Sequence, residues 1–292
     1  MQANAGRFPD WIRRQWPSGE AHQEVKALLE GLDLHTVCQS AHCPNQGECW
    51  SRRTATFLVL GNACTRHCAF CGVSHGQPLP VDADEPGKVA EAVRRLGARH
   101  AVITSVTRDD LDDGGAAHIA KTVTAIKKDN AETTVEVLVS DFCGDTAAIA
   151  TVLKSDPEIF GHNIETVERL HPQLRDKRYS YRRSLEVLKI ARGWRMSGFV
   201  KSAFMLGCGE TEADVLGTLR DLRSAGCDAV AMGQYLRPGP DNGPVAEFVT
   251  PDQFSVYEKT AREMGFLFAV AGPFVRSSYR SADLLAAVPA ER

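Results

Sequence analysis

Residues 54–76 read TATFLVLGNACTRHCAFCGVSHG, an apolar run followed by a loop that holds three cysteines. The run at 54–61 is rich in apolar and β-branched residues, as expected of a buried strand. The loop after it places Cys64, Cys68 and Cys71 at the spacing C-x3-C-x2-C. Three thiols without a fourth predict a metal site that something other than cysteine completes.

A second cysteine run lies just upstream, in TVCQSAHCPNQGECW at residues 36–50. It places Cys38, Cys43 and Cys49 at the spacing C-x4-C-x5-C, and it also stops at three. Because thiols of a cytosolic protein stay reduced, metal binding explains these runs better than disulfides do. The other cysteines are scattered, and we assign no chemistry to them: Cys143, Cys208 and Cys227.

The composition is that of an ordinary globular protein. The chain has 292 residues, of which 43% are hydrophobic and 24% charged, so it can bury a large core. A formal net charge of -3 gives no basic field that would attract nucleic acid. The first twenty residues lack the apolar segment of a secretory signal, and no run reaches membrane-spanning length. We therefore expect a cytoplasmic protein without nucleic-acid or membrane partners.

After the cysteine runs the chain alternates between short apolar runs and segments of helical periodicity. The apolar runs are TATFLVLG, HAVITSV, TTVEVLVS, EIFGHNIE, FVKSAFMLG, CDAVAMGQ and FLFAVAG. Helix-start signals open the segments at 84–97, 145–154, 211–226 and 250–265. This pattern predicts an α/β fold, a partial (β/α)6 TIM-like parallel barrel. We expect an N-terminal extension at 1–53, the barrel at 54–270 and a C-terminal segment at 271–292.

The polar motifs follow successive strands, where the active sites of such barrels lie. A structural zinc site is one alternative for the thiols, since His35, His42, His67 and His75 could complete it. Three-cysteine spacings within one loop instead suit an iron–sulfur cube. Three thiolates on a four-iron cluster leave one iron open to a substrate or a cofactor.

The motif at Cys64, Cys68 and Cys71, with Phe70 before the last cysteine, resembles the signature of radical S-adenosylmethionine enzymes. Together with the upstream run, "HNIETV", "GQYLRP" and "GPFVRSSYR", the chain resembles the lipoyl synthases from about Phe8 to Tyr279. The resemblance implies two 4Fe–4S clusters and S-adenosylmethionine as cofactors. It also implies that the extensions carry an auxiliary cluster, on Cys38, Cys43 and Cys49.

The activity implied by the resemblance is insertion of sulfur at C6 and C8 of an octanoyl group on a carrier lysine. The cluster on Cys64, Cys68 and Cys71 would cleave S-adenosylmethionine, and the auxiliary cluster would be consumed as the sulfur donor. The fourth ligand of the auxiliary cluster would be Ser278, the second serine of "RSSY". Without the two cysteine runs, this motif would be a solvated polar tail.

The resemblance also implies partners. They are octanoylated lipoyl carrier domains, namely the E2 subunits of 2-oxoacid dehydrogenases and the H protein of glycine cleavage. An electron donor such as ferredoxin or flavodoxin would reduce the enzyme, and an iron–sulfur carrier would rebuild its auxiliary cluster.

Candidate contacts to S-adenosylmethionine are Phe70, Gly114, Gly115, Asn163, Glu165, Gly209 and Glu210. All but Phe70 also have a simpler interpretation. The glycine motifs suit turns before helices, and Asn163 and Glu165 could belong to a polar network at a strand end. The sequence departs from the family pattern at Thr107, Cys143 and Cys208 and around Asn242. Two other functions stay open: a biotin-synthase-like sulfur insertion, and an electron carrier with fully ligated clusters.

Overall fold

The computed structural model describes residues 8–13, 19–194 and 198–287, and its centre is one eight-stranded sheet. The strands pair in chain order, β1 with β2 antiparallel and β2 to β8 all parallel. Their bounds are β1 His35–Thr36, β2 Thr56–Val59, β3 His100–Ser105, β4 Thr134–Leu138, β5 Ile159–Gly161, β6 Phe199–Leu206, β7 Ala229–Gln234 and β8 Phe268–Gly272. The expected α/β fold with a parallel sheet is confirmed.

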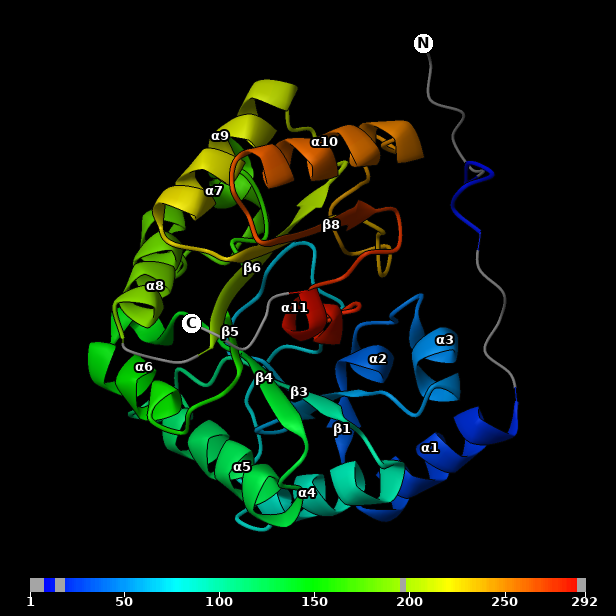
Figure 1. The fold of residues 1–292 in the computed structure, drawn as a ribbon, viewed down its shortest axis with the longest axis vertical. Helices are drawn as coiled ribbons and strands as arrows, with labels where there is room; N and C mark the ends of the chain where they lie inside the picture. Colours follow the sequence, from blue (N-terminus) through cyan, green and yellow to red (C-terminus); the bar gives the residue numbers. More distant parts are fainter. Residues whose placement is uncertain (1–7, 14–18, 195–197, 288–292) are drawn as a thin grey trace.

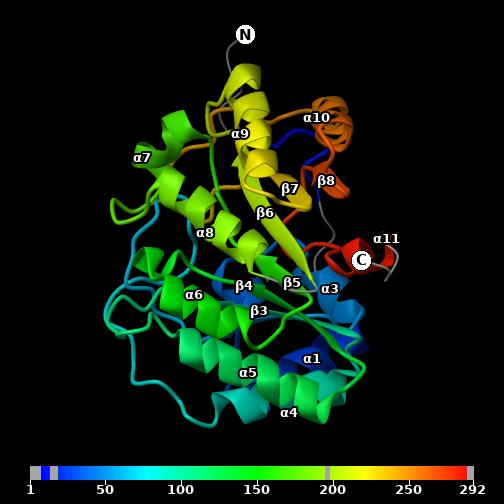
Figure 2. The same cartoon turned by 60° about the vertical axis from the view of Figure 1, so that its left-hand side comes forward.

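Helices connect the parallel strands and cover the outer face of the sheet (Figures 1 and 2). The main connecting helices are α4 Glu85–Leu96, α5 Ala116–Asp129, α6 Thr146–Leu153, α8 Tyr181–Gly193, α9 Glu212–Ser224 and α10 Pro251–Glu263. Short helical turns are η1 Phe142–Gly144, η2 Glu168–Leu170 and α7 His171–Leu174. Within the described residues this gives six strand–helix units followed by β8.

The helix-start signals in the sequence act as capping interactions in the structure. Thr211 and Asp214 form a reciprocal capping box at the start of α9. Asp145 caps α6 by accepting a hydrogen bond from the amide of Ala147. Gly97, in the left-handed conformation at φ 62°, ends α4. These local signals satisfy otherwise unpaired backbone groups, which explains why the helices begin and end where the sequence predicts.

The sheet is an open barrel, because in the described part of the chain β1 and β8 are its two edges. Near this opening lie α2 Val37–Ser40 and α3 Gln46–Ser51 from one end of the chain, and α11 Ala282–Ala287 from the other (Figure 1). The side chain of Asn45 donates a 2.7 Å hydrogen bond to the carbonyl of Phe274. The segments before β2 and after β8 therefore meet beside the open edge of the barrel.

The N-terminal region packs on the barrel as part of the same structure. Helix α1, Glu20–Gly31, buries Val25 and Leu29, and Trp50 of α3 is fully buried next to His22. Strand β1 extends the barrel sheet by pairing with β2. The domain boundaries expected from the sequence stay predictions.

A buried ion pair lies inside the sheet. Lys201 of β6 donates to both carboxylate oxygens of Glu136 of β4, at 2.9 and 3.2 Å, and both side chains are almost fully buried. His100 of β3 lies 3.6 Å from the same carboxylate and 3.1 Å from the hydroxyl of Ser281. A charge network thus links the barrel interior to the C-terminal segment.

None of the helices in the described ranges combines the length and the apolar character that a membrane span requires.

Candidate active site

One cavity of about 1060 Å³ brings the two cysteine runs together. All six cysteines of the runs contribute to its wall, and so does Ser278. None of the nine cysteines of the chain forms a disulfide. Residues that are up to 240 positions apart in the sequence therefore surround one space, as the resemblance requires.

The loop with Cys64, Cys68 and Cys71 follows β2 and is held on several sides by backbone hydrogen bonds. The amide of Cys64 donates to the carbonyl of Ser74, and its carbonyl accepts from the amide of Gly76. The amide of Ala69 donates to the carbonyl of Leu174, in the loop after α7. The loop thus has a fixed path at the carboxyl end of the sheet.

Backbone amides point at two of these thiols. The Sγ of Cys64 accepts hydrogen bonds from the amides of Arg66 and Thr107, both at 3.4 Å. The Sγ of Cys68 accepts one from the amide of Asp176 at 3.3 Å. Such donors stabilise negative charge on sulfur and are known to tune iron–sulfur clusters. The donor set therefore fits a cluster bound through thiolates.

Burial raises the pKa of Cys71 to about 12 and that of Cys38 to about 11. It also raises the pKa of Cys68. When free, these three thiols are therefore protonated at neutral pH, and binding of a metal would release their protons. Among the described residues, no three histidine, cysteine or acidic side chains form a group that could hold a single metal ion.

The upstream cysteines lie on two short helices and the turn between them. Cys38 is in α2, where the hydroxyl of Thr36 caps the helix by accepting from the amide of Gln39 at 3.3 Å. The amide of Cys43 donates to the carbonyl of Cys38, and Cys49 follows in α3. These local bonds bring three cysteines that are separated in sequence to one side of the cavity.

The two serines of "RSSY" have different partners. The hydroxyl of Ser278 accepts a 3.0 Å hydrogen bond from Thr56, the first residue of β2. The hydroxyl of Ser277 donates to the side-chain oxygen of Asn163 at 2.9 Å. Of the two serines, Ser278 bonds the strand that follows the upstream cysteines, and its role as the fourth ligand stays a prediction.

Three of the candidate cofactor contacts line the cavity: Phe70, Asn163 and Glu165. Asn163 and Glu165 follow β5, flank the buried Ile164 and are joined by a 3.1 Å hydrogen bond. Burial raises the pKa of Glu165. The alternation in "HNIE" therefore places both polar side chains on the cavity wall, where an amine or a hydroxyl group could bind.

The remaining candidates lie outside the lining of this cavity, and their contact with the cofactor stays a prediction. Gly114 and Gly115 precede α5 with φ of 60° and 88°, and a side chain on Gly115 would meet Leu60. Gly209 also has a positive φ, of 104°. The carboxylate of Glu210 accepts from the amides of Gly207 and Cys208. Backbone geometry alone accounts for these residues.

Several residues on the cavity wall were missed in the sequence analysis. The guanidinium of Arg175 stacks on the ring of Tyr179 at 3.6 Å, and in the described structure its Nε has no hydrogen-bond partner. His162 is buried on the same wall, with its Nδ1 bonded to the carbonyl of Val139 at 2.9 Å. For His162, the signal was its position directly before Asn163.

Three of the four departures from the family pattern contact the cysteine loop or its neighbours. The side chain of Asn242 donates to the carbonyls of Ala69 and Cys71 at 3.2 and 2.9 Å. The backbone amide of Thr107 donates to the Sγ of Cys64, and the hydroxyl of Thr107 hydrogen-bonds the hydroxyl of Tyr179. Cys143 lies 3.0 Å from a guanidinium nitrogen of Arg66. The departures at these three positions thus alter contacts that hold the cysteine loop, while all six cysteines of the two runs are retained.

Comparison with known proteins decides the family. Residues 58–222 match the radical SAM superfamily, and residues 1–43 match the N-terminal domain of lipoyl synthase. The lipoyl synthase of Rubrobacter xylanophilus is 50% identical over 273 residues, which cover 94% of this chain and 85% of that protein. That of Caldanaerobacter subterraneus is 50% identical over 275 residues, which cover 94% and 96%.

The chain belongs to the lipoyl synthase family.

Solved structures support the radical SAM fold. Methylornithine synthase superposes with a TM-score of 0.56 at 13% identity, covering 85% of this chain and 74% of that one. The FeFe-hydrogenase maturase HydG from Carboxydothermus hydrogenoformans gives 0.57 at 12% identity, covering 90% and 77%. At such identities the likeness concerns the fold alone.

Family membership makes this chain a radical SAM enzyme. It implies a 4Fe–4S cluster and S-adenosylmethionine as cofactors, and the residues that line the cavity fit both. The match to lipoyl synthases also sets aside the biotin-synthase-like and electron-carrier alternatives.

Proposed function

We propose that this chain inserts two sulfur atoms, at C6 and C8, into an octanoyl group that is amide-linked to a lysine of a lipoyl carrier domain. The observation that carries the proposal is the shared cavity, whose wall includes both cysteine runs and Ser278. A site for generating radicals and a site for donating sulfur must both reach the same alkyl chain. One common cavity meets that requirement.

In this proposal Cys64, Cys68 and Cys71 hold a four-iron cluster with one iron left open. The auxiliary cluster is held by Cys38, Cys43, Cys49 and Ser278. When bound, the first cluster supplies the electron that cleaves S-adenosylmethionine, and the auxiliary cluster supplies the sulfur.

The chain's own residues would orient the cofactor and stabilise the thiolates. Asn163 and Glu165 offer an amide and a carboxyl group to the polar groups of S-adenosylmethionine, and Phe70 offers an apolar surface. The amides that donate to Cys64 and Cys68 compensate negative charge on those sulfurs.

Ser278 would make the auxiliary site chemically distinct. Iron in these clusters ordinarily takes soft thiolate ligands, so a hard oxygen ligand is a plausible weak point of the cluster. The hydrogen bond from Thr56 keeps the serine hydroxyl beside the cavity. This arrangement suits a cluster that must come apart to give up sulfur.

The proposed partners follow from the chemistry. Octanoylated carrier domains, those of 2-oxoacid dehydrogenase E2 subunits and the glycine cleavage H protein, would bring the substrate. Ferredoxin or flavodoxin would supply electrons, and an iron–sulfur carrier would rebuild the auxiliary cluster. All of these are proteins of the same compartment, for which we propose the cytoplasm.

The experiment that tests the function is mass analysis of an octanoylated carrier peptide after anaerobic incubation with reconstituted enzyme, S-adenosylmethionine and a reductant. We expect the mass of a lipoyl peptide, at about one group per chain when no other sulfur source is present. Sulfur isotope built into the auxiliary cluster should appear in that product. Many turnovers without a sulfur source, or a peptide of unchanged mass, would contradict the proposal.

A further inference from the structure

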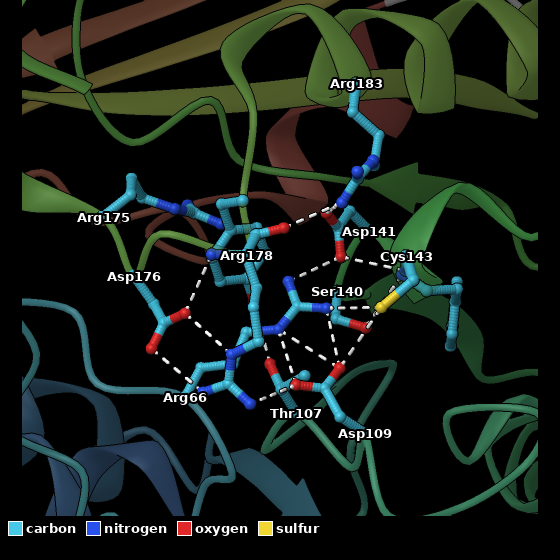
Figure 3. Close-up of polar contacts among 12 residues, drawn as sticks. Arg66, Thr107, Asp109, Ser140, Asp141, Cys143, Arg175, Asp176, Arg178 and Arg183 are labelled. Atoms are coloured by element: carbon cyan, nitrogen blue, oxygen red, sulfur yellow. Dashed lines mark hydrogen bonds and ion pairs between the residues drawn. The ribbon is translucent and has the colours of Figure 1, made fainter. Parts of the chain in front are cut away.

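Arg66 lies within the C-x3-C-x2-C loop, two residues after Cys64 and two before Cys68, and its side chain is fully buried. Figure 3 shows polar side chains from several loops gathered around its guanidinium. A buried guanidinium is costly unless its donors are paired. Its partners therefore indicate what this residue does.

Two carboxylates on neighbouring loops bind the guanidinium. Asp109 accepts from Nε at 2.8 Å with one oxygen and from Nη2 at 2.7 Å with the other, in the parallel geometry that arginine forms with a carboxylate. Asp141, which is fully buried, accepts from Nη1 at 2.7 Å. Asp109 follows β3 and Asp141 follows β4. One side chain thus ties the cysteine loop after β2 to the ends of the next two strands.

The flat face of the same guanidinium is also occupied. Its central carbon lies 4.1 Å from the ring centroid of Tyr179, whose hydroxyl bonds Thr107 at 2.8 Å. With edge and face both bound, the side chain of Arg66 has one defined orientation. The main chain of Arg66 is then fixed too, and its amide is one of the two that donate to the Sγ of Cys64.

We propose that Arg66 is a positioning residue for the cluster on Cys64, Cys68 and Cys71, an inference that rests on the proposed function. By joining the loop to Asp109 and Asp141, it sets the geometry in which the three thiolates meet the cluster and an amide meets Cys64. A lysine would keep the positive charge, but its single ammonium group cannot form the parallel pair of bonds or the flat stacking contact. Charge alone is therefore insufficient.

The test compares Arg66→Gln, Arg66→Lys and the matched control Arg183→Gln. Arg183, in α8, binds the same Asp141 at 3.2 Å but from a partly exposed position, and it also donates to the carbonyl of Arg178. The readouts are iron content after anaerobic reconstitution and the electron paramagnetic resonance spectrum of reduced protein, with and without S-adenosylmethionine. Wild type should load about eight irons.

We expect Arg66→Gln to keep about four irons, those of the auxiliary cluster, and to lose the spectral response to S-adenosylmethionine. Arg66→Lys should load more iron, with an altered spectrum and a weaker response. Arg183→Gln should behave as wild type. Iron retained by the auxiliary site also shows that Arg66→Gln has folded; if that variant does not fold, Asp109→Asn replaces it, because Asp109 is 19% exposed.

Full iron content and a wild-type spectrum in Arg66→Lys and in Arg66→Gln or its replacement would overturn the inference. An equal loss of iron and of spectral response in Arg183→Gln would also overturn it. The loss would then follow from disturbing Asp141 and would not be specific to Arg66. A wild-type protein that binds no four-iron cluster at Cys64, Cys68 and Cys71 would instead overturn the proposed function.

Discussion

The hydroxyl of Thr56 donates a 3.0 Å hydrogen bond to the hydroxyl of Ser278, which joins the first residue of β2 to the C-terminal segment. This bond holds the proposed oxygen ligand on the cavity wall. It also suggests a simpler role for Ser278, as a hydrogen-bond partner that attaches the C-terminal segment to the barrel.

Replacing Ser278 by alanine should separate the two roles. We expect Ser278→Ala to release 5'-deoxyadenosine but to form no lipoyl product, because only the auxiliary cluster would lose a ligand. Thr56→Val is the matched control: it removes the hydrogen-bond donor and keeps the serine hydroxyl. Chromatography of deoxyadenosine and mass analysis of the peptide check both. Equal product loss in the two variants would favour the simpler role.

The two cysteine runs should fail in different ways. Changing Cys64, Cys68 and Cys71 to alanine should leave about four irons and abolish cleavage of S-adenosylmethionine. Changing Cys38, Cys43 and Cys49 should also leave about four irons, keep some cleavage and give no lipoyl product. Iron analysis and deoxyadenosine yield distinguish the outcomes. Cleavage that survives loss of the first three cysteines would show that the assignment is wrong.

Two buried histidines should make the fold sensitive to mild acid. Burial, together with the charge of Arg175, lowers the pKa of His162 and of His171 from 6.5 to about 4. Below pH 6.5 both histidines become protonated in the unfolded chain but stay neutral in the folded chain. The free energy of unfolding that they contribute is therefore present at pH 7 and is lost as the pH falls toward 4. Each histidine should contribute a loss of at most about 2 kcal/mol between pH 7 and pH 5.

Urea unfolding of the cluster-free protein at the two pH values measures this loss without acid damage to the clusters. His171→Gln should remove about half of the pH dependence. If wild type is equally stable at pH 7 and pH 5, the two histidines are not held neutral by the fold.

The buried pair inside the barrel should depend on both of its members. Glu136→Gln leaves the ammonium group of Lys201 buried without a charged partner, so we expect a loss of about 3–5 kcal/mol in the free energy of unfolding. The double variant Glu136→Gln with Lys201→Met removes both charges and should recover part of that loss. Urea denaturation of all three proteins checks this, and a single variant as stable as wild type would contradict it.

The alternation of strands and helices could be predicted because each signal is local. Periodicity of apolar residues and capping residues such as Thr211 and Asp145 act within a few positions of the chain. The parallel topology correctly placed the loop with Cys64, Cys68 and Cys71 at the carboxyl end of β2. The expectation that the upstream run shares this rim was wrong, because that run follows β1, which is antiparallel to β2 and ends beside the first residues of β2. Strand β1 could not be predicted, because its two residues are too few to form a pattern.

The contacts of Arg66 could not be predicted either, because its partners lie 43 and 75 residues away in the sequence. Periodicity does not indicate which residues of three different loops meet. For Gly115 the sequence allowed two interpretations, because its context suits both a turn and a cofactor contact. The structure shows the positive φ and the close approach to Leu60 that make glycine necessary there.

The meeting of the segments before β2 and after β8, beside the open barrel edge, has a consequence for biosynthesis. A ribosome produces Cys38, Cys43 and Cys49 early, but Ser278 only after every strand of the sheet has been made. A nascent chain therefore carries the upstream thiols for most of its synthesis without the serine that the proposed site requires. Iron delivered during translation would meet an incomplete ligand set. Maturation of the auxiliary centre is accordingly expected to follow release of the chain, and a fragment that stops before Phe274 should keep the parallel strands yet never retain this centre.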